Sequence, residues 1–414
     1  MAKANLLGEV FQAYFDARRN KRNTHSQLAF EVDCEHNLVE LYEDIKERKY
    51  TPLPATCFIT DYPVKREVFA SQFRDRVIHH LLYNYLSPIF DLKMIYDSYS
   101  CRKGKGTSLG INRFEHHIRS CTDNFRWQAW VLKLDVKDFF MSINRHKLFV
   151  LVEKTLERYW KLHPDCDRRR NTGMDRDTLM YLLDQIIYWN PVDGCDMRGK
   201  RSEWHGLPPS KSLLNSPPGV GLPIGDLTSQ LFSNFYLHEL DVFVKQTLHC
   251  KHYGRYADDF FIVHPNKTFL KEQVPLIRDF LKRELELILH PKKIYFQECR
   301  KGAPFLGSVV KPFRRYAGTR SVKNFNRAVT RMSAELDRYK KANILPDIRL
   351  LEQQRSVLNS YLGYFANYKS RKLVTKRIMK SSILEYFCIP ADCSRAIIRK
   401  YRYEERNMPQ KGGR

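Results

Sequence analysis

An acidic pair, Asp258 and Asp259, separates two short apolar segments, CKHYGRY and FFIVH. Two short apolar runs around a brief polar break are typical of a β-hairpin, so the pair is expected to project from a tight turn. Acidic dipeptides are common in turns, because the Asp side chain hydrogen-bonds the local backbone. The pair alone therefore predicts a hairpin and leaves the function of its carboxylates open.

A third carboxylate, Asp135, lies at the end of the short apolar segment WVLKLDV, which begins at Trp130. Such a run is typical of a buried strand. A carboxylate at the end of a buried strand is costly to desolvate unless a cation compensates it. If adjacent strands bring Asp135, Asp258 and Asp259 together, two divalent ions about 3.5–4 Å apart would offset their repulsion and support phosphoryl transfer.

The order of predicted elements places mixed strands and helices first and basic helices last. Apolar residues recur at helical spacing in the first 50 residues, in 152–187 and in 320–384. The pattern predicts an α+β core followed by an all-α module. Finer predictions are an irregular hairpin after Thr51, a helix stopped at Pro88, a loop over 188–218, a helix over 273–289 and one strand over 303–310.

Positive charge is concentrated in the last quarter of the sequence. Lys and Arg total 71 against 46 Asp and Glu, a net charge of +25, and residues 311–414 hold 25 basic and 8 acidic residues. Such a surface favours a polyanion, because each phosphate neutralised by Lys or Arg releases condensed counterions. Tyr361 and Tyr364 lie among these charges and favour nucleic acid, since bases stack on aromatic rings; core packing is the alternative for these rings.

The sequence predicts neither a membrane span nor a secretory route. No run of about 18 apolar residues occurs, and the first 23 residues lack the apolar core of a secretory signal. The ten cysteines show no Cys-x-x-Cys spacing, so neither a zinc ribbon nor a disulfide scaffold is indicated. These features predict a cytoplasmic protein.

The chain resembles the reverse transcriptase family in five strings that follow a fixed order. They are LKLDVKDFF from Leu132, GLPIGDLTSQ from Gly221, YADD from Tyr256, HPKK from His290 and FLG from Phe305. The resemblance implies a right-hand polymerase fold with helical and hairpin fingers, an antiparallel-sheet palm and an all-α basic thumb. It implies this division: N-terminal helices and fingers in 1–130, palm in 131–310 with an insertion at about 155–218, thumb in 311–394, and a basic tail in 395–414.

In that family, three aspartates bind two Mg²⁺ ions for nucleotidyl transfer. The resemblance carries this role to Asp135, Asp258 and Asp259, with the backbone carbonyl of Val136 completing a site. Phe140 falls at the family's aromatic sugar gate, whose ring excludes a ribose 2′-hydroxyl. A plain core aromatic is the alternative for Phe140.

Several basic residues fall at further positions that have roles in the family. Lys293 matches a lysine near the triphosphate, and a solvated lysine pair is the alternative. Lys65 and Arg66 match residues that grip the incoming nucleotide, where an Arg suits phosphate oxygens. A basic loop offers template or nucleotide contacts, or is only a solvated turn; its candidates are Arg102, Lys103 and Lys105.

The string GLPIGDLTSQ departs from most reverse transcriptases, which carry Gln-Gly and then Ser-Pro. Here Ile224-Gly225 is followed by Ser229-Gln230, which is similar to the reverse transcriptases of diversity-generating retroelements. The resemblance makes Ile224, Gly225 and Gln230 candidate nucleotide-site residues. Ile224 cannot hydrogen-bond a nucleotide as Gln could, and a site with fewer polar constraints discriminates less well.

The resemblance implies an RNA-directed DNA polymerase that makes adenine-mutagenic cDNA. Its implied ligands are two Mg²⁺ ions, a template RNA, the RNA/cDNA duplex and deoxynucleoside triphosphates, and its implied partner is an oligomeric accessory variability determinant protein. A retron-like or defence-associated reverse transcriptase is the alternative of the same fold. A non-catalytic RNA-binding scaffold is the alternative of another class, and three clustered carboxylates favour an enzyme over it.

Overall fold

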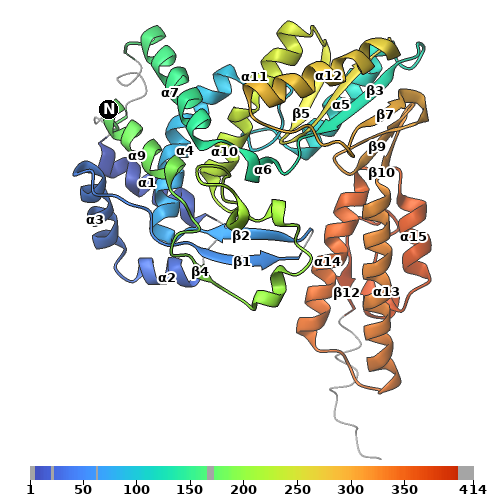
Figure 1. Cartoon of the computed structure of the whole chain (residues 1–414). Helices are drawn as coiled ribbons and strands as arrows, with labels where there is room; N and C mark the ends of the chain where they lie inside the picture. Colours follow the sequence, from blue (N-terminus) through green and yellow to red (C-terminus); the bar gives the residue numbers. More distant parts are fainter. Residues whose placement is uncertain (1–4, 20–22, 62–63, 166–171, 400–414) are drawn as a thin grey trace, which may run out of the picture. The chain divides into compact units, whose positions relative to one another are not determined.

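The computed structural model describes residues 5–19, 23–61, 64–165 and 172–399. The chain forms two compact units: unit 1 comprises Met1–Arg113 and Trp130–Phe296, and unit 2 comprises Phe114–Ala129 and Gln297–Arg414. Helices combine with mainly antiparallel sheets, so the predicted α+β class is confirmed (Figure 1). The finer division into fingers, palm, insertion, thumb and tail stays a prediction. Within the described ranges, no helix is both long enough and apolar enough to cross a membrane.

Unit 1 begins with three helices, as the helical spacing of the first 50 residues predicts. These are α1 (Leu6–Arg18), α2 (His25–Glu31) and α3 (Cys34–Lys46). The Asn5 side chain caps α1 by accepting a hydrogen bond from the Gly8 N–H at 2.7 Å. The apolar faces of the three helices join the main core of unit 1, and α1 packs along α4.

Helix α4 (Phe73–Lys93) continues through Pro88, so the predicted stop at that proline is wrong. Proline removes one helical hydrogen bond and crowds the carbonyl four residues earlier. The residues that follow, Ile89 and Phe90, are 2% and 0% exposed, and the Phe90 ring stacks on Phe235 with 4.0 Å between centroids. This long-range packing outweighs the local cost of the proline.

A small three-stranded sheet in unit 1 has the order β2-β1-β4. β1 (Thr56–Thr60) and β2 (Arg66–Ala70) pair antiparallel along their full length, while β4 (Asp196–Met197) pairs parallel with β1. The predicted irregular hairpin is therefore a regular one, because the prolines of the TPLP segment precede β1 rather than interrupt it. The 188–218 loop supplies β4, which makes β1 a central strand.

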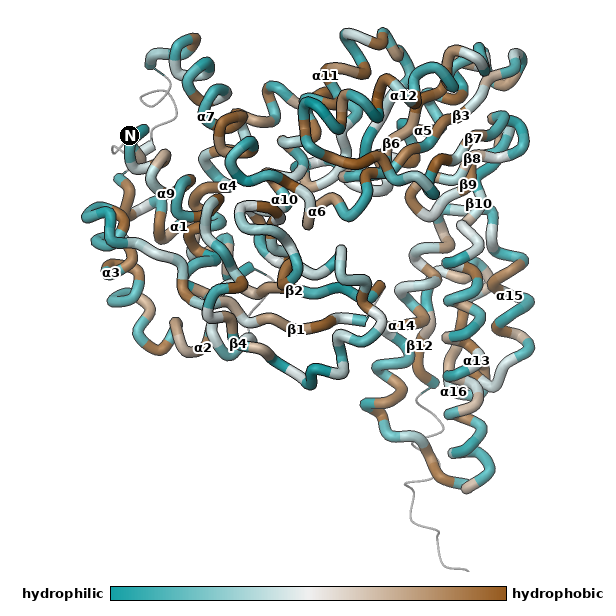
Figure 2. Tube along the Cα trace, in the orientation of Figure 1, coloured by the Kyte–Doolittle hydropathy of each residue, from teal (hydrophilic) through white to brown (hydrophobic). Residues whose placement is uncertain are grey.

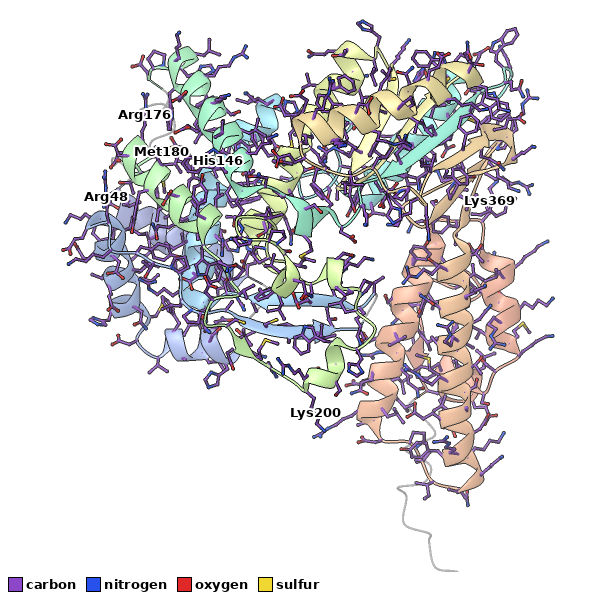
Figure 3. The ribbon with its side chains drawn as sticks, viewed as in Figure 1. Arg48, His146, Arg176, Met180, Lys200 and Lys369 are labelled. Atoms are coloured by element: carbon purple, nitrogen blue, oxygen red, sulfur yellow. The ribbon has the colours of Figure 1, made fainter. Side chains whose placement is uncertain are left out.

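The rest of the 188–218 segment contains three short 3-10 turns, η1 (Arg201–Trp204), η2 (Pro209–Lys211) and η3 (Leu213–Asn215). Lys200, labelled in Figure 3, immediately precedes η1. The buried carboxylate of Glu67 fastens the segment to β2 by accepting three hydrogen bonds. Its donors are the Trp204 indole at 2.8 Å, the Ser212 hydroxyl at 2.7 Å and the Leu213 N–H at 2.7 Å.

The main sheet has the order β5-β6-β3-β7. Its strands are β3 (Trp130–Asp135), β5 (His252–Tyr256), β6 (Asp259–His264) and β7 (Tyr295–Glu298). β6 pairs antiparallel with both β5 and β3. The predicted buried strand and the predicted hairpin are both confirmed, and they are neighbours in one sheet.

Helices from distant parts of the chain complete unit 1. They are α6 (Phe139–Ser142), α7 (Arg145–Leu162), α9 (Arg176–Tyr188), α10 (Leu227–Tyr236), α11 (His238–Val242), the π-helical turn η4 (Phe243–Thr247) and α12 (Lys267–Glu284). α12 lies on β3 and β6. It begins before the predicted start at 273, because the Asn266 side chain caps it by accepting from the Thr268 and Phe269 N–H groups, and it ends at Glu284, before the predicted end at 289.

Unit 2 holds a second sheet and a helical bundle with its own core. α5 (Thr107–Cys121) runs into this unit, and the η5 turn (Cys299–Lys301) precedes the sheet. The predicted single strand over 303–310 is wrong: left-handed Leu306 and Gly307 (φ +48° and +78°) form a turn between two strands. The sheet consists of β8 (Ala303–Phe305), β9 (Ser308–Lys311) and β10 (Arg314–Ala317).

The helices of unit 2 confirm the basic helical bundle predicted for 320–384. They are α13 (Thr319–Lys341), α14 (Ile348–Ala366), α15 (Arg371–Met379) and α16 (Ile383–Tyr386). Two short strands follow, β11 (Phe387–Cys388) and β12 (Ile397–Ile398). The start of the predicted 395–414 tail therefore belongs to a strand pair, and residues 400–414 lie outside the described residues.

Candidate active site

The β5–β6 hairpin presents the acidic pair at the edge of the main sheet. Tyr256 pairs with Asp259, so Ala257 and Asp258 form a two-residue turn. Ala257 has φ +52°, a left-handed conformation that residues with a side chain rarely adopt. The turn is therefore strained, and contacts from the surrounding protein must hold it.

Asp135 reaches the same place from β3. It lies directly opposite Asp259 in the antiparallel register, and the Val136 N–H donates to the Asp258 carbonyl at 3.3 Å. The Cβ atoms of directly opposed antiparallel residues are about 4.5–5.5 Å apart. The structure thus brings together the three aspartates and Val136 that the sequence predicts.

The three carboxylates repel one another in a partly dehydrated setting. Burial, and then the charges of Asp135 and Asp259, raise the pKa of Asp258 to about 6. Burial also raises the pKa of Asp259, against the lowering effect of Lys133, whose Nζ lies 3.3 Å from an Asp259 oxygen. The site therefore holds negative charge that its own lysines do not fully compensate.

Lys293 is the predicted nucleotide-site lysine that the structure brings to the aspartates. Its Nζ lies 2.9 and 3.0 Å from the two carboxylate oxygens of Asp135. The HPKK turn positions it, because the His290 N–H donates to the Asp135 carbonyl at 2.8 Å and the Lys293 N–H donates back to the His290 carbonyl. The Lys293 side chain is 53% exposed, so a ligand can reach it from solvent.

Arg255, which the sequence analysis did not single out, is buried beneath the strained turn and supports it by a hydrogen bond to its backbone. Its guanidinium and its partner Asp241 are both 0% exposed, with Nε and Nη2 at 2.7 and 2.6 Å from the two carboxylate oxygens. Nη1 donates to the Ala257 carbonyl at 3.1 Å and to Asn234 at 2.8 Å. The Tyr253 hydroxyl donates to Asp241 at 2.6 Å. The sequence signal that could have revealed Arg255 is an arginine inside a predicted buried strand, since a buried charge requires a partner.

The GLPIG segment links the region after β3 to the small sheet. The Leu222 N–H donates to the Phe140 carbonyl at 2.8 Å, and the Phe69 N–H donates to the Ile224 carbonyl at 3.0 Å. Gly225 has φ +148°, and a Cβ there would lie 2.2 Å from the Phe69 carbonyl oxygen. Only glycine allows the segment to lie this close to β2.

Phe140 and Ile224 pack against one small core, although 84 positions separate them in the numbering. Both side chains are partly buried, and the core they share is formed by Ala55, Cys57, Phe69, Met141 and Leu213. Gln230 lies apart from this core, exposed on α10, and its side-chain oxygen accepts from the Cys101 thiol at 3.4 Å.

The start of α10 is fixed by a buried polar network that the sequence did not predict. Asp226 is 4% exposed and accepts a hydrogen bond from the Ser71 hydroxyl at 2.6 Å. His79 connects α4 to this network, with Nε2 3.5 Å from Asp226 and Nδ1 2.7 Å from the Thr228 hydroxyl. These contacts secure the residues that follow Gly225.

The two predicted basic residues of the hairpin are adjacent: Lys65 ends the β1–β2 connection, and Arg66 begins β2. The Lys65 Nζ donates to the His205 carbonyl at 2.8 Å and lies 3.5 Å from Asp61. Arg66 begins β2 and is exposed. Lys65 is therefore engaged with the 188–218 segment, while the Arg66 side chain faces solvent.

The predicted basic loop is only partly exposed. Arg102 has an 8% exposed side chain and donates to Asp91 at 2.7 Å and to the Ile95 carbonyl at 2.7 Å, bonds that would have to break before it could reach a phosphate. The Lys105 Nζ lies 3.5 Å above the Tyr96 ring and donates to that residue's carbonyl. Lys103 is exposed.

Tyr361 and Tyr364 lie on α14 in unit 2. Both are partly buried against the core of this unit, and the Tyr361 ring packs against Phe325 at 5.4 Å. The Tyr364 hydroxyl donates to the Gly307 carbonyl at 2.8 Å, and burial raises the pKa of this hydroxyl to about 12. In the described structure both rings therefore contribute to packing.

The three aspartates fit a divalent cation in their chemistry. Among the described residues, no group of three or more His, Cys, Asp and Glu side chains is arranged to hold a metal ion as the side chains stand. Carboxylate oxygens are nevertheless the ligands that Mg²⁺ prefers. Burial first, and then the charges of Asp135 and Asp259, raise the pKa of Asp258, and a bound cation would offset both effects.

Comparisons with known proteins give structural likenesses only. No protein-family model matches the chain, and no curated protein matches it. Among solved structures, a telomerase from Candida tropicalis truncated from its C-terminal domain matches at 13% identity with a TM-score of 0.45, over 68% of this chain and 60% of that one. A Candida albicans telomerase in complex with a fragment of telomeric RNA matches at 14% and 0.43, over 82% and 61%. An apo Candida tropicalis telomerase matches at 11% and 0.44, over 82% and 64%. The chain thus spans about three fifths of the length of these structures.

Proposed function

We propose that the chain is an RNA-directed DNA polymerase in which Asp135, Asp258 and Asp259 hold two Mg²⁺ ions. The observation that carries the proposal is the convergence of these three carboxylates where β3 ends and the β5–β6 hairpin turns. The buried guanidinium of Arg255 donates a hydrogen bond to the Ala257 carbonyl in the hairpin turn. Such support is what a catalytic site needs in order to keep its geometry. When bound, the two ions would stabilise the attacking and leaving oxygens of nucleotidyl transfer.

The residues around the aspartates have separate roles in this proposal. The exposed Nζ of Lys293 would leave the Asp135 carboxylate and contact the triphosphate when a nucleotide binds. Phe140 would limit the space available to a ribose 2′-hydroxyl. Ile224 and Gly225 would form the adjoining wall, where glycine allows the backbone to approach β2.

A basic helix face in unit 2 supports a nucleic-acid partner. α13 buries Phe325, Val329, Met332 and Leu336 on one side. Hydrophilic and hydrophobic residues alternate along this helix (Figure 2). The exposed side carries basic residues at helical spacing, which would neutralise the phosphates of a template RNA or an RNA/cDNA duplex; they are Arg320, Lys323, Arg327, Arg331, Arg338 and Lys341.

The particular type of polymerase that we propose is that of a diversity-generating retroelement, which makes adenine-mutagenic cDNA with an accessory variability determinant protein as partner. Ile224 supports this assignment, since its side chain packs among apolar residues where Gln would place an amide. A retron-like or defence-associated enzyme would show ordinary fidelity at template adenines.

Primer extension tests the polymerase proposal. The full chain is incubated with an RNA template, an annealed DNA primer, deoxynucleoside triphosphates and Mg²⁺, and we expect the primer to lengthen. EDTA should stop the reaction, because carboxylates without a metal cannot stabilise the transferred phosphoryl group. Binding of the primer-template without extension, with the accessory protein also supplied, would instead support the RNA-binding scaffold.

Phe140→Ala should admit ribonucleotides while deoxynucleotide addition remains measurable. Truncation of the ring opens the space that a 2′-hydroxyl would need. The measurement is the ratio of ribonucleotide to deoxynucleotide incorporation, and Phe280→Ala, which removes another partly buried ring of unit 1, is the matched control. An unchanged ratio would leave Phe140 as a core residue only.

Ile224→Gln should lower the frequency of substitutions at template adenines, with little change at the other three bases. One restored hydrogen bond of roughly 0.5–1.5 kcal/mol is large enough to detect, since about 1.4 kcal/mol changes an error ratio tenfold. The measurement is sequencing of the cDNA, scored per product because the amide also disturbs the apolar core and lowers total activity. Ile224→Met keeps the side chain apolar and should keep the wild-type spectrum. If the Gln variant also retains the wild-type adenine errors, Ile224 does not set fidelity.

A further inference from the structure

Two large aromatic side chains of unit 2 are held at the surface by strained backbone. Trp127 is 67% exposed, and Phe313 is 70% exposed. Single exposed hydrophobic residues are ordinary on protein surfaces. These two differ because each belongs to a turn with left-handed residues and because the two turns are joined by a direct ring contact.

The loop before Trp127 contains three consecutive left-handed residues. Asp123, Asn124 and Phe125 have φ values of +45°, +55° and +69°. Asp and Asn tolerate this conformation because their short side chains can hydrogen-bond locally, but Phe does not share this property. The Thr122 hydroxyl accepts from the Phe125 N–H at 2.9 Å, and the Thr122 carbonyl accepts from the Trp127 N–H at 2.8 Å.

The turn that carries Phe313 has a similar character. Lys311 pairs with Arg314 across β9 and β10, so Pro312 and Phe313 form a two-residue turn. Phe313 has φ +58° at a position where glycine or asparagine is the usual residue after proline. A bulky ring is thus kept at the tip of the hairpin against the backbone preference, which points to a use for the ring.

Phe125 connects the two turns. Its ring is 7% exposed and packs edge-on against the Phe313 ring with 5.4 Å between centroids. One Arg300 nitrogen donates to the Phe125 and Arg126 carbonyls, each at 2.8 Å. The buried ring and this clamp fix the loop and the hairpin as one piece, which we call the aromatic tip; it comprises residues 122–127 and 311–316.

The charge around the aromatic tip is positive. Lys311 and Arg314 are exposed, and the Arg126 side chain is 77% exposed while paired at 3.1 Å with Asp123. Glu115 on α5 is paired with Arg315. Exposed aromatic rings among cations suit a strand whose bases stack and whose phosphates are neutralised.

We propose that the aromatic tip binds single-stranded nucleic acid by stacking bases on Trp127 and Phe313. Two exposed rings on a rigid base suit unpaired bases, because a duplex keeps its base faces stacked inside. The site lies within unit 2 and does not include the three aspartates, so it can bind without nucleotide or metal. It goes beyond the proposed polymerase activity and does not depend on it.

The test is fluorescence anisotropy with a labelled, unstructured single-stranded RNA, using the full chain in EDTA. Trp127→Ala and Phe313→Asn should each weaken binding about tenfold, since each removes a ring on which one base would stack. Asn accepts the left-handed conformation, so Phe313→Asn removes the ring without straining the turn. Trp127→Phe should restore most of the affinity.

Two controls make the result specific. Phe15→Ala removes a ring that is 55% exposed on α1 in unit 1 and should leave binding unchanged. RNA binding is measured in EDTA and primer extension is measured with Mg²⁺, so failure of the polymerase proposal and failure of this one are distinguishable. Affinity within twofold of wild type for both tip variants would overturn the proposal. Tip variants that lose binding to phosphatidylserine vesicles but keep their affinity for RNA would overturn it as well, in favour of a membrane surface.

Discussion

Asp258→Asn and Asp259→Asn should each abolish nucleotide addition by the chain while leaving RNA binding nearly intact. A neutral amide ligates Mg²⁺ poorly and cannot offset two divalent charges. The RNA-binding surfaces we propose lie in unit 2, so the substitution leaves them unchanged. Primer extension and anisotropy measure the two properties separately. Asp279→Asn changes an exposed acid on α12 and is the matched control. Extension by both site variants at the wild-type rate would contradict the assignment.

Asp258→Asn should also stabilise the metal-free protein at neutral and higher pH. Asp258 has a pKa raised to about 6 in the folded state, so its ionised form opposes folding, and this cost grows as pH rises from about 4 through 6. Asn carries no charge and avoids the cost, which is at most about 3 kcal/mol for two pH units. Urea unfolding in EDTA at pH 8 should show Asp258→Asn above wild type, and the difference should shrink toward pH 4. Equal stability at pH 8 would mean that burial and the neighbouring carboxylates do not disfavour ionised Asp258 as the structure indicates.

Asp241→Asn should strongly destabilise unit 1 and reduce polymerase activity with it. The substitution leaves the Arg255 guanidinium buried without a counter-charge, and breaking a buried pair of this kind costs about 3–5 kcal/mol. Arg255 also donates to the Ala257 carbonyl, so the turn that carries Asp258 loses its support. The measurement is the midpoint of urea unfolding, followed by primer extension below that midpoint.

Asp91→Asn provides a matched comparison. Arg102 and Asp91 have the same Nε–Oδ1 distance of 2.7 Å as Arg255 and Asp241, but the Asp91 side chain is 38% exposed. Pairs open to solvent contribute about 0–1 kcal/mol. Equal losses in the two variants would show that burial does not set the strength of the Arg255–Asp241 pair.

The sequence located the aspartates because their neighbours in the chain carry the signal. Asp135 ends an apolar strand and Asp258 lies between two, and β3, β5 and β6 have the predicted character. Local periodicity also predicted the helices of unit 2, where one apolar face repeats along α13. These features depend on residues within a few positions of one another.

Predictions failed where distant residues decide the outcome. Pro88 stays inside α4 because Phe90 stacks on Phe235. The hairpin after Thr51 becomes part of a three-stranded sheet because β4 arrives from the 188–218 segment. The energy of such contacts is not encoded in a short window of sequence.

The sequence by itself therefore determined the α+β class, the hairpin that carries the acidic pair, the strand that ends at Asp135 and the basic helical bundle. Only the tertiary structure decided that Asp135 lies opposite Asp259, that Lys293 reaches Asp135, and that Arg255 supports the turn at Ala257. The physical reason is how far apart in the sequence the interacting residues lie. Strand and helix periodicity is set by neighbouring residues, whereas the Asp135–Asp259 register and the Lys293–Asp135 pair exist only after segments more than a hundred residues apart have packed together.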